Sequence, residues 1–329
     1  MGFFNSLAAM ATIAMVKYSQ ATTAKFVTVS MSPDPLPSGQ LPVISREAVC
    51  ADWAAWVPST SDPAVVLQVV SGTYIDVERN FIYWMELKTS FTRNHLYLLC
   101  LDDDSVDFLE SSMGIRCLPL AGLNISSHGD IWVLRVRVLS CLVEAGHDVI
   151  MSDADALWLA DPMEDFTLPG VVDSSIVASR GKFPTDVGKV WGSTICMGFI
   201  LFRATASRAA MGEFVTVMKA GLVLNRKDDQ IAVNMAARDL GIVWKQEGSD
   251  MRYEDSTAFG VGTIDSLKDE ENRPFIVTLL PHSTYTRICG KTPVSNTTVV
   301  AHCLSSKSAG AKRDWMHIMD LWSVDEDTH

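Results

Sequence analysis

The chain has 329 residues, of which 48% are hydrophobic and 20% are charged, and its formal net charge is −12. This balance is typical of a globular protein and excludes an intrinsically disordered one. The acidic charge argues against a nucleic-acid-binding protein, which needs a basic surface to displace counterions from phosphates. The sequence contains no apolar run of about 18 residues, so it predicts no standard membrane-spanning helix.

The chain begins with a mostly apolar run, residues 3–16, that ends at Lys17. Its length suits the core of a signal peptide and is short for a membrane anchor, although neither a basic stretch before it nor a clean cleavage site after it is present. Sequons at Asn124 and Asn296 would accept glycans on a secreted protein. We therefore expect the chain to enter the secretory pathway and to associate with a membrane through this run. A cytoplasmic location is the alternative.

A Pro/Ser-rich stretch within residues 20–62 separates this run from the rest of the chain. We interpret residues 1–62 as an apolar segment followed by a loose arm, and residues 63–329 as one folded domain. In that domain, short apolar runs predict strands and apolar residues at helical spacing predict helices. The predicted strands cover residues 64–70, 96–101, 147–151, 175–178, 196–202, 242–245, 275–279 and 298–301. The predicted helices cover residues 76–87, 131–145, 207–221, 230–240 and 312–322.

This alternation of strands and helices predicts an α/β fold. Its near-continuous apolar strands indicate a mostly parallel sheet with helices on both faces. Ligands of such sheets bind beyond the carboxyl ends of the strands, so functional residues are expected directly after each strand.

The seven cysteines lie mostly among apolar neighbours and form neither a CxxC pair nor a Cys/His cluster with zinc spacing. The odd number prevents complete pairing within the chain. We expect buried free thiols, with one or two disulfides as the alternative.

The most informative segment is residues 146–162, in which a hydrophobic strand is followed by Asp153 and Asp155. This spacing can bring both carboxylates toward one point, where they repel each other unless a cation joins them. A hard divalent ion, Mg²⁺ or Mn²⁺, satisfies such a pair and leaves positions that phosphate oxygens can fill. An isolated D-x-D is more often a solvated surface turn, but the strand before it, Trp158 and Pro162 favour a metal and diphosphate site.

Residues 153–162 resemble the D-x-D-x-x-W-x-x-x-P motif of nucleotide-sugar glycosyltransferases with the GT-A fold, and most closely that of the retaining enzymes of family 77. Four other segments resemble that family in the same order, over residues 65–322. They are residues 73–84, with an aromatic residue, Asn and Trp; residues 135–138, where the family carries R-P-R and this chain lacks the Pro; residues 198–203, as G-F-x-x-x-R; and residues 228–234, as D-D-Q-x-x-x-N.

The resemblance implies a Rossmann-like GT-A domain that uses a UDP-sugar and Mn²⁺ or Mg²⁺. Asp155 would bind the metal directly, and Asp153 would bind the metal or the ribose. His302, after the last predicted strand, would complete the metal site, although the family's His-x-Asn is His-Cys-Leu here. Lys307 and Lys312 would neutralise the leaving diphosphate; the alternative for each is a solvated surface lysine.

Asp229 and Gln230 are the candidate catalytic residues, because a polar side chain beneath the anomeric carbon would steady an oxocarbenium-like centre. The alternative is that Asp228 or Asp229 is the N-cap of the helix that follows. Tyr74 is placed to stack on the base or to join the core. Arg135 and Arg137 would bind the nucleotide or the acidic cluster, and otherwise line the solvent face of their helix.

These observations predict a hexosyl- or pentosyltransferase of the Golgi that moves a sugar to a glycan, glycoprotein or other hydroxyl acceptor. One alternative is a phosphatase of the haloacid dehalogenase type, which also carries D-x-D after a strand. That class needs Thr or Val where this chain has Leu157, and it places the motif on the first strand of the domain. A second alternative is a non-catalytic protein that binds sugar nucleotides or glycans.

Overall fold

The structure is a computed structural model. It describes residues 64–118, 120, 125, 127–225, 228–245, 251–253, 256–287, 294–303 and 308–324, together with Cys50, Trp53 and Val57. All of these belong to one compact unit, Ile44–His329. The N-terminal apolar run, the predicted boundary at residues 62 and 63, Asn124 and Lys307 lie outside the described residues.

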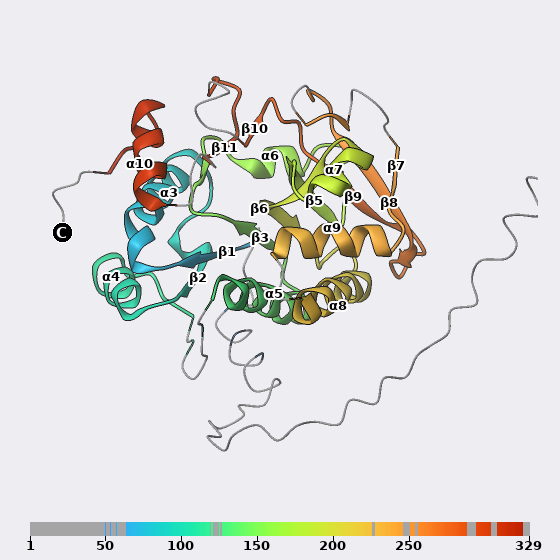
Figure 1. Ribbon diagram of the computed structural model, residues 1–329, viewed down its shortest axis with the longest axis horizontal. Coiled ribbons are helices and arrows are strands. Elements are labelled where there is room, and N and C mark those ends of the chain that lie inside the picture. Colours follow the sequence, from blue (N-terminus) through green and yellow to red (C-terminus); the bar gives the residue numbers. More distant parts are fainter. Residues whose placement is uncertain are drawn as a thin grey trace, which may run out of the picture. The chain divides into compact units, whose positions relative to one another are not determined.

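The centre of this unit is an eight-stranded sheet in the order β2-β1-β3-β6-β5-β9-β8-β7 (Figure 1). β6 and β8 are antiparallel to their neighbours, so the other six strands point the same way. The predicted α/β fold with a mostly parallel sheet is therefore confirmed. The strands are β1 Val65–Val70, β2 Leu96–Cys100, β3 Val149–Ser152, β5 Ile176–Gly181, β6 Thr194–Phe202, β7 Val243–Trp244, β8 Gly260–Lys268 and β9 Pro274–Leu279.

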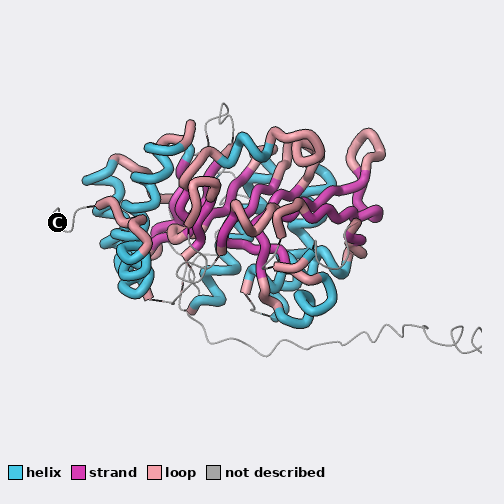
Figure 2. Tube along the Cα trace, turned by 90° about the horizontal axis from the view of Figure 1, so that it is seen from above, coloured by secondary structure: helices cyan, strands magenta, loops and turns pink. Residues whose placement is uncertain are grey.

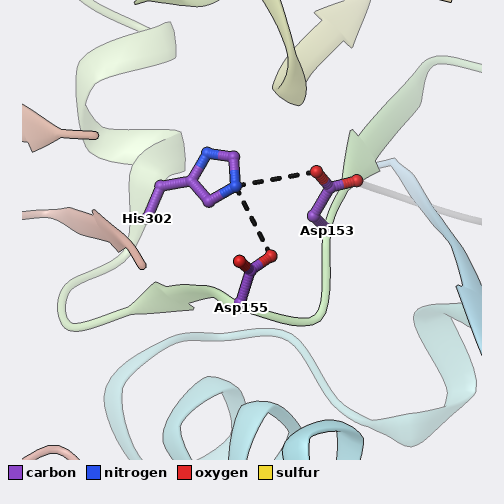
Figure 3. A group of neighbouring side chains, drawn as sticks. All are labelled: Asp153, Asp155 and His302. Carbon is purple, nitrogen blue, oxygen red and sulfur yellow. Dashed lines mark ion pairs between the residues drawn. The ribbon is translucent and has the colours of Figure 1, made fainter. Parts of the chain in front are cut away.

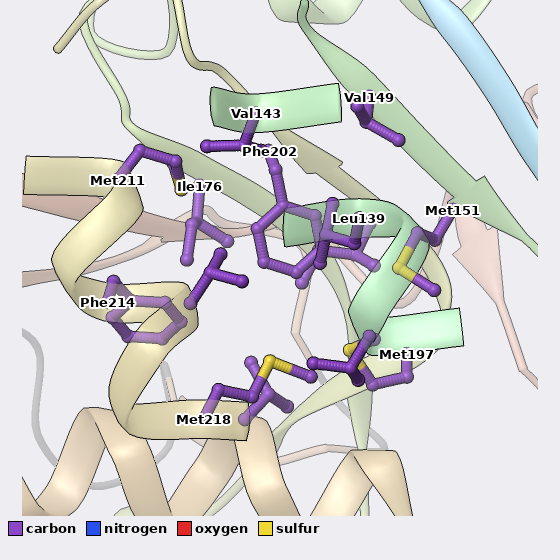
Figure 4. Close-up of a cluster of buried hydrophobic side chains, with 14 of the residues drawn as sticks. Leu139, Val143, Val149, Met151, Ile176, Met197, Phe202, Met211, Phe214 and Met218 are labelled. Carbon is purple, nitrogen blue, oxygen red and sulfur yellow. The ribbon is translucent and has the colours of Figure 1, made fainter. Parts of the chain in front are cut away.

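Helices cover both faces of the sheet (Figure 2). α5 (His128–Ala145), α8 (Arg208–Asn225) and α9 (Asp229–Asp239) pack on one face, and α3 (Ile75–Lys88) and α10 (Ala309–Ile318) on the other. Side chains of each strand alternate between the two cores: Val65 and Leu67 of β1 join the first, and Val66 joins the second. Figure 4 shows the first core, where side chains of α5 and α8 meet those of β3, β5 and β6.

A second, three-stranded sheet lies in the order β10-β11-β4, with β4 at Ala156–Trp158, β10 at Tyr285–Thr286 and β11 at Val300–His302. β4 follows the D-x-D segment, and β11 runs antiparallel to it with His302 opposite Ala156. This sheet therefore brings the end of the chain's last strand to the aspartate pair.

The structure also contains elements that the sequence patterns did not predict. The acidic triplet after β2 does not only close that strand: Asp102 accepts a hydrogen bond from Ser105 N and opens α4 (Asp103–Met113). β8 was missed because its residues, GVGTIDSLK, include two glycines and only three hydrophobic residues. The shorter elements are η1 Gly72–Tyr74, η2 Arg93–His95, α6 Pro162–Phe166 and α7 Thr185–Trp191.

The expectation of free thiols was wrong for most of the described cysteines. Disulfides join Cys50 to Cys141 and Cys100 to Cys117, and Cys303 is disulfide-bonded as well. Cys196 is a buried free thiol. Within the described ranges, none of the helices combines the length and the hydrophobicity needed to cross a membrane.

Candidate active site

The D-x-D segment is a tight turn between β3 and β4. Asp153 N–H donates to Gly198 O on the neighbouring β6, and Ala156 N–H donates back to Asp153 O, both at 2.9 Å. Trp158 holds the turn in place, because its buried indole packs edge-on against Phe91 and Phe199 and its Nε1–H donates to Ser152 Oγ. The motif's Trp therefore has a packing role that holds both carboxylates at the end of the strand.

Asp153, Asp155 and His302 converge on one point (Figure 3). His302 Nε2 lies 3.6 Å from Asp153 Oδ2 and 3.4 Å from Asp155 Oδ1. One ligand atom from each residue lies within 4.8 Å of the others, a spacing that could hold a metal ion. Asp155 and His302 are each 2% exposed, whereas the Asp153 side chain is 35% exposed, so the group opens to solvent on the Asp153 side.

The chemistry of this group fits a divalent cation. Both ring nitrogens of His302 are buried and have no hydrogen-bond partner among the described residues, which is costly unless a further group binds there. Two carboxylates and an imidazole are also a ligand set that Mn²⁺ accepts, and a bound ion would displace the imidazole proton. Gly198 contributes space, since a Cβ there would lie 2.8 Å from both Asp153 Oδ2 and His302 Nδ1.

Two cations balance the carboxylates. Lys312 Nζ on α10 donates to Asp155 Oδ2 at 2.5 Å. Arg135 on α5 lies 3.2 Å from Asp153 Oδ1 and 3.2 Å from Asp229 Oδ2, so one buried guanidinium joins the D-x-D segment to the start of α9.

These contacts change the protonation of the buried groups. Burial raises the pKa of Asp155, but His302 and Lys312 outweigh that effect and the pKa ends below its usual value. The pKa of Asp229 rises to about 7, because its burial is only partly offset by Arg135. Burial lowers the pKa of Lys312, and Asp155 reverses the shift so that it ends above its usual value.

Asp229 and Gln230 lie in the first turn of α9. Asp228 is the N-cap: its carboxylate accepts from Gln230 N and Ile231 N, so the helix-capping alternative holds for Asp228. The Gln230 side chain makes one hydrogen bond at each end of its amide, as Nε2 donates to Phe183 O and Oε1 accepts from Arg287 Nη2. Its amide is thereby held in one orientation beside Asp229.

The structure brings two further residues to this region that sequence reasoning missed. Arg287 follows β10, and Cys196 lies on β6 two residues before Gly198. The pKa of the Cys196 thiol falls to about 7, because Arg287 and His302 more than offset the effect of burial, which raises it. Neither residue belongs to a recognisable motif, and only their positions at strand ends could have indicated them.

The model of one protein family, nucleotide-diphospho-sugar transferase, matches residues 125–292, which are 168 of the 329 residues. The chain belongs to the nucleotide-diphospho-sugar transferase family. The matched range includes Arg135, both aspartates of the D-x-D segment and Gln230. None of the curated proteins with which the sequence was compared matches it.

Three solved structures are similar to this chain at low identity. The apo WbbM bifunctional glycosyltransferase is 14% identical over 51% of this chain and 38% of its own, with a TM-score of 0.36. The glycosyltransferase GlyE of Streptococcus pneumoniae TIGR4 is 16% identical over 54% of this chain and 43% of its own, also at 0.36. The galactosyltransferase LgtC, in complex with donor and acceptor sugar analogs, is 10% identical over 80% of this chain and 98% of its own, at 0.36. This chain thus spans less than half the length of the first two.

The remaining candidate residues divide into those near the carboxylates and those away from them. Tyr74 is half-buried at the end of η1, with Lys312 Nζ 5.6 Å from its ring centroid, so it borders the site. Arg137 is exposed, and no ion pair within the described part of the chain includes it, which agrees with the solvent-face alternative. Lys307 lies outside the described residues.

Other residues of the family-like segments have structural roles. Asn80 and Trp84 on α3 both donate to Leu321 O, and Asn80 Oδ1 accepts from Ser323 N, which anchors the segment after α10. Asn234 on α9 bonds both the N–H and the carbonyl of Ile195 on β6. These contacts fix the two helices that carry Lys312 and Gln230.

Proposed function

We propose that this protein is a metal-dependent retaining glycosyltransferase that moves a sugar from a UDP-sugar to a hydroxyl group of a glycan, glycoprotein or other acceptor. The convergence of Asp153, Asp155 and His302 is the observation that carries the proposal. Family membership supports a sugar-nucleotide donor. The five ordered motif resemblances support family 77 and, with it, retention of the anomeric configuration.

Mn²⁺ or Mg²⁺ would be held by Asp155 and His302, with Asp153 as a third ligand. The bound ion would neutralise the diphosphate of the donor and so make it a better leaving group. Lys312 would add a point charge at the same diphosphate, because its Nζ contacts Asp155 and lies 5.6 Å from the Tyr74 ring centroid. Tyr74 would stack on the uracil base.

The candidate catalytic residues have separate roles. Gln230 presents a fixed amide, whose oxygen would steady positive charge at the anomeric carbon as the diphosphate leaves. Asp229 would orient the donor sugar by fixing the position of Arg135, which forms ion pairs with both Asp229 and Asp153. Because retaining transfer places acceptor and leaving group on the same face of the sugar, the diphosphate can accept the proton of the acceptor hydroxyl.

We further propose a secretory location, with the Golgi as the compartment. The disulfides of Cys50, Cys100, Cys117 and Cys141 support it, since such bonds persist in oxidising compartments. The transferred sugar would be a hexose or a pentose, a choice that the shape of the donor pocket sets.

The test is a panel of UDP-sugars incubated with Mn²⁺ and scored for UDP release, with and without acceptor extracts. We expect one donor to be consumed, consumption to stop in excess chelator and Mn²⁺ to restore it. Full activity in chelator would refute the metal requirement. Tight binding of UDP-sugars without any turnover would favour the non-catalytic alternative, and hydrolysis of p-nitrophenyl phosphate would favour the phosphatase.

A further inference from the structure

The guanidinium of Arg287 lies at the Gln230 end of the site, and no carboxylate of the described residues pairs with it. Its Nη2 donates to Gln230 Oε1 at 3.2 Å, and its Nε is buried without a hydrogen-bond partner in the described structure. The other two cations of the site each bind a carboxylate, Arg135 at Asp153 and Lys312 at Asp155. No described carboxylate forms such an ion pair with Arg287.

The surroundings hold Arg287 in place. Its backbone N–H donates to His282 Nε2 at 3.4 Å, and its side chain lies against Gly181 at the end of β5. A Cβ at Gly181 would lie 2.5 Å from Arg287 Nη1 and 2.6 Å from Thr194 Oγ1. The guanidinium therefore occupies space that only a glycine leaves open.

Holding a charged group with its Nε away from water is unfavourable unless an anion compensates it. The neutral amide of Gln230 supplies one acceptor and no charge. A carboxylate satisfies a guanidinium best, because two parallel N–H···O bonds match the planar fork. Gln230 is also the residue proposed to contact the anomeric carbon, so a ligand of Arg287 would belong to one of the two sugars that meet there.

We infer that Arg287 binds a carboxylate of a substrate sugar, so that the enzyme prefers a uronate to the matching neutral sugar. This inference rests on the proposed function. The carboxylate could belong to the donor or to the acceptor, since both approach the anomeric carbon.

The donor is tested by calorimetric titration in the presence of Mn²⁺ with UDP, UDP-glucose and UDP-glucuronate, the last two differing only at C6. The proteins are wild type, Arg287→Gln and the control Arg238→Gln, which alters an exposed arginine at the far end of α9. If the donor carries the carboxylate, wild type and the control bind UDP-glucuronate at least about tenfold more tightly than UDP-glucose, and Arg287→Gln loses this difference.

The acceptor is tested by UDP release from the preferred donor with methyl glucuronide or methyl glucoside as acceptor. If the acceptor carries the carboxylate, the donors bind alike, and the glucuronide is the better acceptor by about tenfold in wild type and the control only. Equal use of charged and neutral sugars in both experiments would overturn the inference. So would an Arg287→Gln variant that slows neutral and charged substrates equally, because Arg287 would then only position Gln230.

The titration separates the two proposals. Binding of UDP, with no preference for the uronate among either the donors or the acceptors, refutes the role of Arg287 and leaves the proposed function standing. If UDP fails to bind in the presence of Mn²⁺, the proposed function fails and the inference fails with it.

Discussion

Lys312 Nζ lies 2.5 Å from Asp155 Oδ2, although 157 residues separate the two along the chain. The second aspartate of the D-x-D segment is thus bound by the C-terminal helix as well as by His302. A cation that binds Asp155 must share it with Lys312 or turn the lysine toward the diphosphate. Either outcome ties metal binding to donor binding.

Asp155→Asn should abolish transfer, because it removes the charge that holds both the cation and Lys312. We expect activity to fall by at least ~10²-fold, measured as UDP release with saturating Mn²⁺. Asp265→Asn, an exposed substitution on β8, is the control and should retain wild-type activity. Near-normal transfer by Asp155→Asn would remove this residue from the site.

His302→Ala tests the third ligand of the cation. Mn²⁺ affinity should fall by about an order of magnitude or more, since the imidazole supplies the nitrogen of the set. Titration with Mn²⁺ and the thermal midpoint are measured on the same variant. A loss of ~1–3 kcal/mol in stability with unchanged Mn²⁺ affinity would identify His302 as a packed core residue instead.

Gln230→Ala should lower kcat by about tenfold or more and change the KM for the donor little, because the proposed contact strengthens as positive charge develops. Steady-state kinetics with varied donor separates the two constants. A higher KM with unchanged kcat would place Gln230 in donor binding alone.

Arg135→Met should destabilise the fold by about 3–5 kcal/mol, since Asp229 and Asp153 would both lose the buried cation with which they pair. The control is Arg137→Met, which alters an exposed arginine two residues further along the same helix. It should change the free energy of unfolding by less than ~0.5 kcal/mol. Urea unfolding of both variants is the measurement. Equal effects would mean that the ion pairs of Arg135 contribute nothing measurable.

Glu78 predicts a pH dependence of stability that is independent of the cation site. Burial raises the pKa of this carboxyl from 4.5 to about 8, and it lies beside the Gln68 amide on β1. The folded state therefore binds a proton that the unfolded state releases between these pH values, and stability falls as pH rises from about 4.5 to about 8. Above that range this contribution is constant.

Glu78→Gln keeps the shape without the titration. Its thermal midpoint should exceed that of wild type at pH 8.5, and the two midpoints should converge at pH 5. The corresponding difference in the free energy of unfolding at high pH is on the order of a few kcal/mol. The midpoints are measured by calorimetry across this range. Parallel curves for the two proteins would show that Glu78 does not carry the pH dependence.

The sequence predicted the strands of the sheet best where apolar runs end in turn residues, as at β1 and β3. It missed β8, which is an antiparallel strand near the sheet edge with polar and glycine positions, so that its pairing with β9 rather than its own pattern defines it. The D-x-D segment was predicted because strand, motif and turn are contiguous. Arg287 was not, because its position depends on β10 pairing with β11 and on the absence of a side chain at Gly181.

The cysteines illustrate the same limit. Cys100 and Cys117 are 17 residues apart. They meet because an isolated bridge pairs Cys117 with Leu98 of β2 and so places Cys117 beside that strand. Cys50 and Cys141 are 91 residues apart. Such pairings follow from the topology, which spacing along the chain does not reveal.

The anchoring of the segment after α10 by Asn80 and Trp84 has a consequence for biosynthesis. His302 and Lys312 reach the aspartates only when this late part of the chain has docked onto α3, which is made early. On the ribosome, where the chain grows by roughly 5–20 residues per second, Asp153 and Asp155 exist for many seconds without either partner. Arg135 is already present to pair with Asp153, but the nascent sheet must tolerate Asp155 without its own cation until residue 312 has emerged, and a divalent ion in the compartment of synthesis could act as its first counterion.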